Sequence, residues 1–239
     1  MIFKHKFEAG LKDINEKNEI KSKAILEMLE NIAEKHSYSI GEGLNSVKKT
    51  GLTWMLLDWK VKMFKNPCYG DEVDLKTWSR EAKKFYAYRD FEIYVNGEKA
   101  GIASSNWILI DIYNQRPARI TDDFINKYEP EIDMKVFEED NIEKMRELEE
   151  YENVIEYKVR RSDIDINGHM HNLNYLDVVS EAIDEEDCNK SFKNIRITYK
   201  KEIKLGEVVK CYSKKIDDAY FFVIKSYDDL VVHALIELS

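Results

Sequence analysis

The chain has 239 residues, of which 44% are hydrophobic, and its formal net charge is −9 at pH 7. This length fits one large domain or two smaller ones, and the hydrophobic share is ordinary for a globular protein. No stretch approaches the ~20 apolar residues of a membrane span, and the first residues contain no apolar run of signal-peptide length. We therefore expect a cytoplasmic protein without membrane insertion.

The negative charge is concentrated in one segment. Between Glu129 and Glu156, twelve acidic side chains stand against three basic ones, and this excess equals the net charge of the whole chain. The rest is neutral overall and carries short basic clusters. These indicate an ordinary mixed surface by default, and a docking surface for an acidic partner as the alternative. Nucleic-acid binding is not expected, because there is neither an aromatic-basic stripe nor a DNA-reading helix.

The three cysteines predict neither a disulfide framework nor a zinc site. Cys68, Cys188 and Cys211 lie far apart, their number is odd, and none belongs to a C-x-x-C pair. This pattern is typical of reduced thiols in a cytosol.

The first half starts with an expected short strand at Phe3 to Phe7. The segment Lys21 to Lys35 repeats apolar residues at i, i+3, i+4 and i+7, which predicts an amphipathic helix. Three glycines between residues 41 and 51 then indicate loops. Alternating apolar and polar runs follow, and the last two meet at Asn96-Gly97, the pattern of a tight hairpin. The expected strands are Trp54 to Phe64, Glu72 to Ala82, Phe85 to Val95 and Ile102 to Ile112.

The second half repeats this order. Val154 to Val159 resembles the opening strand, and Asn174 to Ile183 is the expected second helix. Asp13-Ile14-Asn15 precedes the first helix as Asp165-Ile166-Asn167 precedes the second, which suggests an alignment of the two halves. The remaining expected strands are Ile195 to Ile203, Glu207 to Ile216, Ala219 to Ser226 and Val231 to Leu238.

A helix wrapped by an antiparallel sheet is the hot-dog plan, so the chain is predicted to be an α+β protein with a tandem (double) hot-dog fold. The expected domains are an N-terminal hot-dog at 1–126, an acidic connector at 127–152 and a C-terminal hot-dog at 153–239. Ile142, Met145 and Leu148 have helical spacing, so the connector is expected to be helical.

The densest polar cluster, Arg161 to Tyr175, lies directly before the second expected helix. A helix start offers free backbone N–H groups and a positive dipole end, which suit a developing negative charge on a carbonyl oxygen. From the residues alone a structural interpretation is preferred, in which Asp165 and Asn167 shape a turn and an asparagine caps the helix.

A family resemblance reverses that preference. Residues 162–175 read SDIDINGHMHNLNY and resemble the S-D-x-D-x-N-x-H-x-x-N-x-x-Y signature of the acyl-acyl carrier protein thioesterases of plant plastids and bacteria. Residues 199–202, YKKE, are similar to the family's Y-R-R-E. Further landmarks in the same order are Leu52-Thr53-Trp54, Gly70-Asp71, Thr77-Trp78 and Ala103 to Trp107. The similarity runs from Phe3 over nearly the whole chain, and the family fold is the tandem hot-dog.

The resemblance implies a hydrolase that releases fatty acids from acyl carrier protein, whose phosphopantetheine arm carries the acyl chain. No cofactor and no metal are expected. The matching catalytic set is Asp165, Asn167, His169 and Glu202. Glu202 would be the general base for an attacking water. Asn167 and His169 would position that water or donate to the thioester oxygen, and Asp165 would orient one of them.

Two departures from the family pattern affect these expectations. Ile203 stands where plant members often have a cysteine after the glutamate, so no thiol nucleophile is expected there. The chain also begins almost at its first strand, without a transit segment, which favours a bacterial, cytoplasmic protein.

The first half is expected to be catalytically empty, because Lys17 stands where the repeat would place His169. By the resemblance this half houses much of the acyl-chain pocket. Plain core packing is the alternative for each candidate lining residue. The candidates are Met28, Trp54, Met55 and Trp107.

Other functions stay open. Coenzyme A carries the same arm, so an acyl-coenzyme A thioesterase is the first alternative, and a non-catalytic acyl-binding hot-dog protein is the second. A metallohydrolase built on His169-Met170-His171 lacks convincing third and fourth ligands. The sequence decides neither the acyl chain length nor whether the chain forms a homodimer.

Overall fold

The computed structural model describes residues 1–239, which form two compact units, Met1–Ile142 and Glu143–Ser239. The boundary falls inside the acidic segment between the two expected hot-dogs. None of the helices has the length and apolar character of a membrane-spanning segment.

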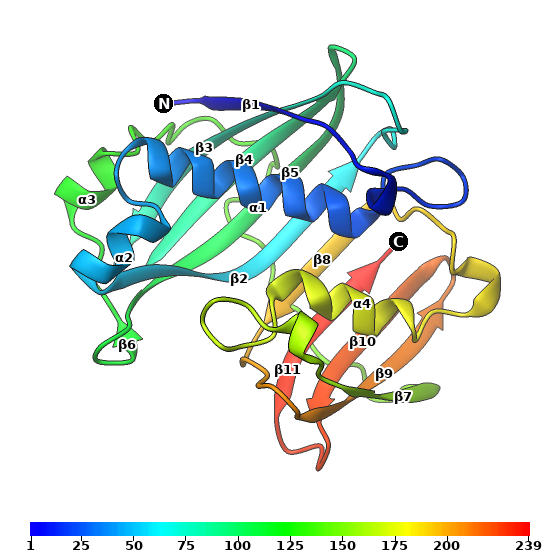
Figure 1. The fold of residues 1–239 in the computed structure, drawn as a ribbon. Helices are drawn as coiled ribbons and strands as arrows, with labels where there is room; N and C mark the ends of the chain where they lie inside the picture. The colour runs from blue at the N-terminus through cyan, green and yellow to red at the C-terminus, as the bar shows by residue number, and fades with distance from the viewer. The chain divides into compact units, whose positions relative to one another are not determined.

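In the first unit, helix α1 (Ser22–Ser39) lies across one face of an antiparallel sheet, where it packs its apolar stripe (Figure 1). The strand order in this unit is β1-β3-β4-β5-β2. The strands are β1 (Phe3–Phe7), β2 (Leu52–Met63), β3 (Val73–Lys83), β4 (Tyr86–Val95) and β5 (Glu98–Asp111), and the short β6 (Arg116–Pro117) pairs with β5.

The hairpin predicted at Asn96-Gly97 is confirmed. Val95 pairs with Glu98 across it, and Asn96 and Gly97 have φ angles of 52° and 83°. Positive φ at both central residues is the requirement of a type I′ turn, which Asn-Gly meets with little strain.

Two short helices in this unit were not expected. Helix α2 (Leu44–Thr50) lies where glycines indicated loops, and it has no buried residue. Without an apolar stripe there is no 3.6-residue period to detect. Helix α3 (Asp122–Asn126) is capped by Thr121, whose side chain accepts from the Phe124 N–H.

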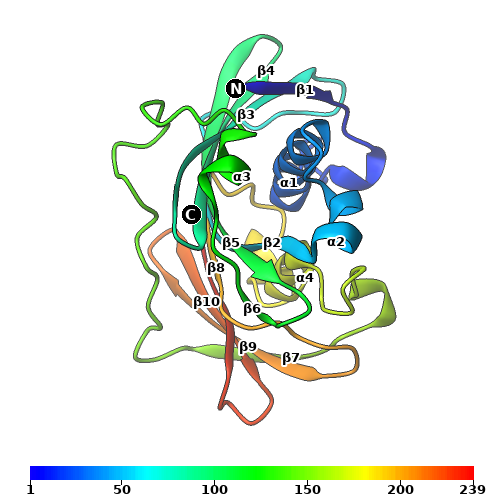
Figure 2. The ribbon, with the colours of Figure 1, turned by 90° about the vertical axis from the view of Figure 1, so that its left-hand side faces the viewer.

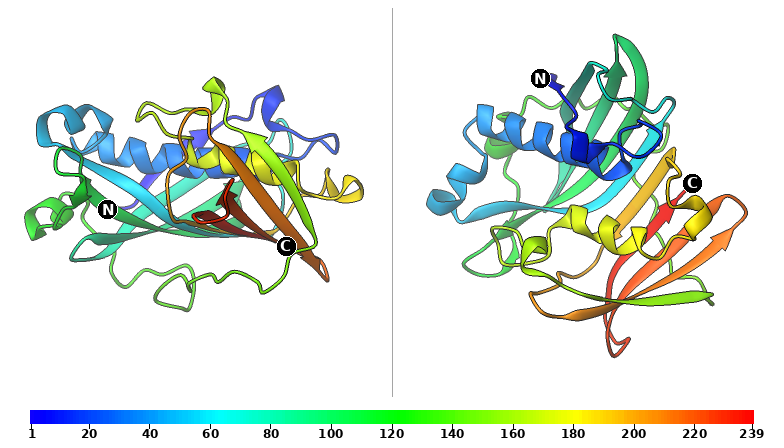
Figure 3. Two further views of the ribbon diagram at one scale, coloured as in Figure 1. Left: turned by 90° about the horizontal axis from the view of Figure 1, so that it is seen from below. Right: turned by 45° about the vertical axis from the view of Figure 1, so that its right-hand side comes forward.

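The second unit has the same plan, with strand order β8-β11-β10-β9-β7. Helix α4 (Tyr175–Ser180) lies across one face of this sheet (Figure 3, right). A 3-10 turn (Asn172–Asn174) precedes it, and the helix ends before the expected Ile183. The strands are β7 (Asn153–Lys158), β8 (Asn194–Tyr199), β9 (Val208–Ile216), β10 (Ala219–Ser226) and β11 (Val232–Leu238).

Each unit is therefore a helix on one face of an antiparallel sheet, as the end-on view of α1 in Figure 2 shows for the first. The predicted α+β hot-dog plan is confirmed for both halves.

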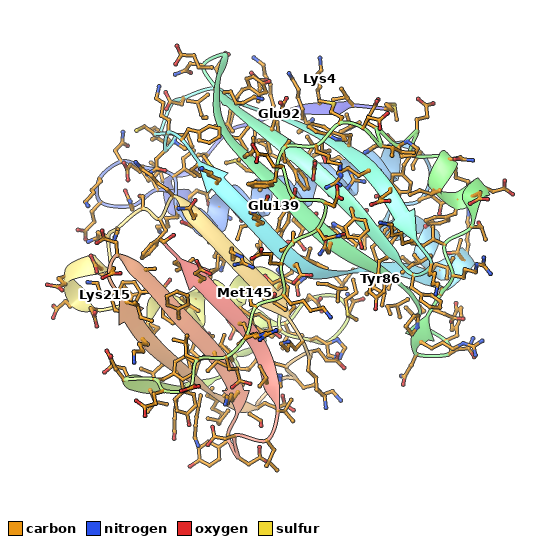
Figure 4. All side chains as sticks on the ribbon, turned by 180° about the vertical axis from the view of Figure 1, so that it is seen from behind. Lys4, Tyr86, Glu92, Glu139, Met145 and Lys215 are labelled. Atoms are coloured by element: carbon orange, nitrogen blue, oxygen red, sulfur yellow. The ribbon has the colours of Figure 1, made fainter.

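The prediction of a helical connector is wrong, because residues 129–152 contain no helix. In the first unit this segment runs over the sheet face opposite α1 (Figure 4, Glu139). There the Trp78 indole donates to the Met134 carbonyl at 2.9 Å. The three-residue spacing of Ile142, Met145 and Leu148 also fits an extended polyproline II chain, which has three residues per turn. This spacing therefore does not by itself indicate a helix. Like charges four residues apart, at Glu139, Glu143 and Glu147, also oppose a helix.

Candidate active site

The loop that carries three of the candidate residues is anchored by Asp163. This side chain is 2% exposed and accepts from the Arg160 N–H at 2.8 Å and from the Tyr157 hydroxyl at 2.9 Å. The Arg160 guanidinium lies 3.1 Å from it. Burial alone would raise the pKa of Asp163, but these hydrogen bonds to the charged form outweigh burial and hold the pKa below its usual value. Asp163 is therefore ionised, and its carboxylate holds the start of the loop in place.

Asp165 organises the turn that follows. Its Oδ1 accepts from the N–H groups of Asn167 at 2.8 Å and His169 at 3.2 Å. Its Oδ2 accepts from Asn167 Nδ2 at 3.2 Å. Gly168, at φ +82°, allows the chain to reverse. Asp165 therefore orients the Asn167 amide and holds the backbone of His169, whereas it does not hydrogen-bond the His169 ring.

Glu202 lies beside this loop on the segment that follows β8. The Met170 N–H donates to the Ile203 carbonyl at 2.8 Å, and His169 and Lys204 form an antiparallel bridge. Because side chains alternate along an extended chain, Glu202 lies on the same side as Lys204 and His169. Ile203 is fully buried on the other side. The structure thus brings the four predicted site residues to one place.

The Glu202 carboxylate is exposed. Lys200 and Lys201 are its neighbours in the sequence, but the salt bridges of this unit do not join either lysine to Glu202. No group of three or more His, Cys, Asp and Glu side chains is arranged to hold a metal ion.

His171 is not one of the four residues that match the family's catalytic set, and the structure gives it a defined place. Its Nδ1 accepts from the Leu173 N–H at 3.3 Å, so the ring proton is on Nε2 when the imidazole is neutral. His169 pairs with Lys204 in an antiparallel bridge. Two residues further along one segment and two residues back along the other, His171 lies opposite Glu202. The H-x-H spacing could have indicated this, since it places both rings on one side of an extended segment.

The amide groups of the next turn are already engaged. His171 accepts from the Leu173 N–H through its ring and from the Asn174 N–H through its carbonyl. The helix start was expected to hold a substrate oxygen through its free N–H groups, but the N–H groups of Leu173 and Asn174 are not available for this. The Asn167 amide and the His169 ring are the polar donors that the loop itself presents.

The first unit contains a second copy of the loop frame, at Gly10 to Ile20. Asn15 Oδ1 accepts from the N–H groups of Lys17 and Glu19, both at 3.0 Å, as the carboxylate of Asp165 does for its loop. Asp13 accepts from the Gly10 N–H at 2.8 Å, as Asp163 accepts from the Arg160 N–H in the second unit.

These hydrogen bonds correct the alignment of the two halves. Asp13 corresponds to Asp163, so its alignment with Asp165 is wrong by two residues. The Ile20 N–H donates to the Pro67 carbonyl at 2.7 Å, the counterpart of the bond to Ile203, which places Asn66 at the position of Glu202. The two Asp-Ile-Asn triplets occupy positions that differ by two residues in the two loops, so their recurrence in the sequence gives the wrong alignment. The residues that replace Asp165, Asn167, His169 and Glu202 are, in order, Asn15, Lys17, Glu19 and Asn66.

Two of the four candidate pocket residues lie on the sheet face that α1 covers, and a third lies on α1. Met28 is buried on α1 itself. The Trp54 indole donates to the Tyr128 hydroxyl at 3.0 Å, and Trp107 shares this sheet face, because Trp54 pairs with Leu109, two residues further on. Met55 is 43% exposed and, by alternation, lies on the opposite face.

Two family models match the chain: the acyl-ACP thioesterase N-terminal domain over residues 1–128 and the acyl-ACP thioesterase C-terminal domain over residues 146–233. Oleoyl-acyl carrier protein thioesterase 1 of Arabidopsis thaliana is 25% identical over 226 residues, which are 87% of this chain and 62% of that protein. Palmitoyl-acyl carrier protein thioesterase of Cuphea hookeriana is 29% identical over 144 residues, which are 58% of this chain and 35% of that protein. The chain thus spans less than two thirds of the length of these relatives.

Solved structures of similar fold include the 12:0-ACP thioesterase from Umbellularia californica, with a TM-score of 0.87 at 18% identity, covering 100% of this chain and 96% of that one. An acyl-ACP thioesterase from Bacteroides thetaiotaomicron has a TM-score of 0.85 at 18% identity, covering 99% of this chain and 96% of that one. At such identities the likeness concerns the fold.

Proposed function

The chain belongs to the acyl-acyl carrier protein thioesterase family, and on that premise we propose that it hydrolyses fatty-acyl thioesters of acyl carrier protein and releases free fatty acid. The observation that carries the proposal is the gathering of Asp165, Asn167, His169 and Glu202 around one hydrogen-bonded loop. The test is the release of fatty acid from acyl carrier protein esters of graded chain length by the purified protein. Binding without release would leave a non-catalytic acyl-binding protein.

In the proposed mechanism Glu202 takes a proton from the attacking water. A carboxylate that is exposed and free of an ion pair is available as a base. The water oxygen bonds to the thioester carbon, and the carbonyl oxygen becomes an oxyanion. The Asn167 amide, held by Asp165, and the His169 ring donate hydrogen bonds where that charge develops. Collapse of the intermediate breaks the C–S bond, and the carrier thiolate leaves and is protonated.

The acyl chain is proposed to lie in the N-terminal hot-dog (residues 1–126), with catalysis in the C-terminal one (153–239). Support comes from Met28, Trp54 and Trp107, which the structure places on the helix side of the first sheet. Met55 lies on the opposite face of the sheet and does not line this region.

No cysteine takes part in this mechanism, so a variant without thiols is expected to keep its activity. Cys211 is fully buried, and burial raises the pKa of its thiol to about 12, so it is almost never a thiolate at neutral pH. The variant combines Cys68→Ser and Cys188→Ser with Cys211→Ala, because alanine avoids an unpaired hydroxyl in the core. Steady-state assays check the rate, and mass spectrometry after acid quenching checks for an acyl-cysteine. A trapped adduct would overturn the attack by water.

A cationic rim next to the loop supports acyl carrier protein, an acidic partner, over a small thioester. It consists of the exposed Arg161, Lys200, Lys201 and Lys204. Ile166 and Leu205, 80% and 52% exposed, add apolar surface to it. Arg160 is not part of the rim because it is paired with the buried Asp163. Opposite charges across such a surface speed up encounter and lose effect with salt.

Arg161→Glu is therefore expected to lower kcat/KM severalfold for acyl carrier protein esters at low salt and to leave short pantetheine esters unaffected. About 0.5 M salt shortens the Debye length to roughly 4 Å and should remove most of the difference. Lys193→Glu is the matched control, since it makes the same charge change at the other end of β8. If neither salt nor Arg161→Glu separates the two substrates, the rim does not bind the carrier protein.

A further inference from the structure

The peptide that leads into Glu202 is held by a buried histidine outside the family signature. The β8–β11 ladder ends at the pair Tyr199 and Ala234, and His233 is the next residue on β11. His233 is 4% exposed, and its carbonyl accepts from the N–H groups of Lys200 at 2.8 Å and Lys201 at 3.3 Å. This bifurcated contact ends β8 before the Ile203 expected from the sequence.

The ring of His233 closes the contact from the other side. Its Nδ1 lies 3.1 Å from the Lys201 carbonyl oxygen. A carbonyl can only accept, so the proton of the neutral ring is on Nδ1. The backbone of Lys201 is thus held at both its N–H and its carbonyl by one residue.

Tyr175 supplies a second donor to the same carbonyl. Its hydroxyl lies 3.4 Å from the Lys201 oxygen, and the side chain is 3% exposed. Burial, followed by the negative charge of Glu202, raises the pKa of Tyr175 above its usual value, so the hydroxyl keeps its proton. The ring packs edge-on against Tyr199 at 5.3 Å.

Glu202 therefore lies between two fixed backbone carbonyl groups. On its N-terminal side the Lys201 carbonyl is held by His233 and Tyr175. On its C-terminal side the Ile203 carbonyl is held by the Met170 N–H from the catalytic loop. The side chain of Glu202 is itself exposed, so the backbone contacts on either side, and not packing around the carboxylate, fix the position from which it extends.

We propose that His233 is a positioning residue for Glu202, which it directs toward the Asn167–His169 loop by clamping the Lys201 peptide. This inference rests on the proposed function, in which Glu202 is the base. Losing the clamp frees one peptide rotation and displaces the carboxylate. Displacements of about 1 Å in catalytic groups cost up to roughly 100-fold in rate.

The test compares His233→Leu with His233→Asn. Leucine and asparagine have similar shapes, but only the asparagine amide offers an N–H near the position of Nδ1. His233→Leu is expected to lower kcat by about 10- to 100-fold with little change in KM. His233→Asn is expected to stay within about threefold of wild type, because it restores the donor. Equal kcat values for the two variants would overturn the proposal.

A double-mutant cycle separates positioning from a general loss of stability. In a Glu202→Gln background, His233→Leu should reduce kcat no further, since there is no base left to misplace. If Glu202→Gln is itself active, the proposed base fails. If it is inactive and His233→Leu turns over like wild type, only the positioning role fails. Should His233→Leu not fold, Tyr175→Phe removes the second donor without opening the core. An unchanged kcat in Tyr175→Phe would then count against the clamp.

Discussion

Glu202→Gln is expected to lower kcat by about 10²–10⁴ while the protein folds normally. The amide has the size of the carboxylate but cannot take a proton from water. Glu202 is exposed and forms no ion pair with its lysine neighbours, so the exchange should cost little stability. Steady-state release of fatty acid from an acyl carrier protein ester measures kcat, and thermal unfolding checks the fold.

Glu207→Gln is the matched control for this prediction. Glu207 is exposed five residues further on, and its Oε2 accepts from the Lys204 N–H at 3.0 Å. Glutamine can keep that contact through its carbonyl oxygen, so turnover should be unchanged. A Glu202→Gln enzyme within a factor of two of wild type, or an equal loss in the control, would remove Glu202 from the mechanism.

Asp90→Ala is expected to cost about 3–5 kcal/mol of unfolding free energy. Asp90 on β4 is fully buried and lies 3.8 Å from the guanidinium of Arg80, whose side chain is 5% exposed. Its two oxygens also accept from the Ser104 hydroxyl at 2.5 Å and the Val136 N–H at 3.1 Å. Alanine would leave the buried Arg80 cation uncompensated. At about 2–4 °C per kcal/mol, the Tm should fall by roughly 6–20 °C, which calorimetry measures.

Two further variants test the cause of this loss. The double variant Arg80→Met with Asp90→Leu should recover part of the stability, because no buried charge remains. Glu81→Ala breaks the more exposed pair with Lys83 and should cost no more than about 1 kcal/mol. If Asp90→Ala costs as little as Glu81→Ala, Arg80 finds another partner and the prediction is wrong.

The fold was predictable because its long elements carry strong periods. The stripe on α1 and the alternation in β2 each reflect one buried face. Helix α2 and the connector were missed or misassigned because neither buries a continuous face. The connector is held by single contacts, such as Trp78 to the Met134 carbonyl, that no periodicity records.

The sequence predicted that the four candidate residues would lie together, but it did not predict the contacts among them. A motif brought Asp165, Asn167, His169 and Glu202 together, and the structure adds which atoms meet. That Asp165 orients the Asn167 amide and not the His169 ring depends on the turn at Gly168. The contact of His233 with Lys201 joins residues 32 positions apart and depends on where a strand ladder stops. No local sequence pattern indicates this contact.

The second copy of the loop frame shows that the backbone frame and the side chains mounted on it are independent of one another. In the first unit the anchoring carboxylate of Asp13 and the turn around Asn15 persist, although none of the four candidate catalytic residues has its own residue type at the matching position. The hydrogen-bonded frame between a strand and its helix therefore forms without the candidate catalytic side chains. It follows that backbone shape at this loop is a poor criterion for assigning activity to a hot-dog protein. Only the side chains mounted on the frame can distinguish a working copy from a silent one.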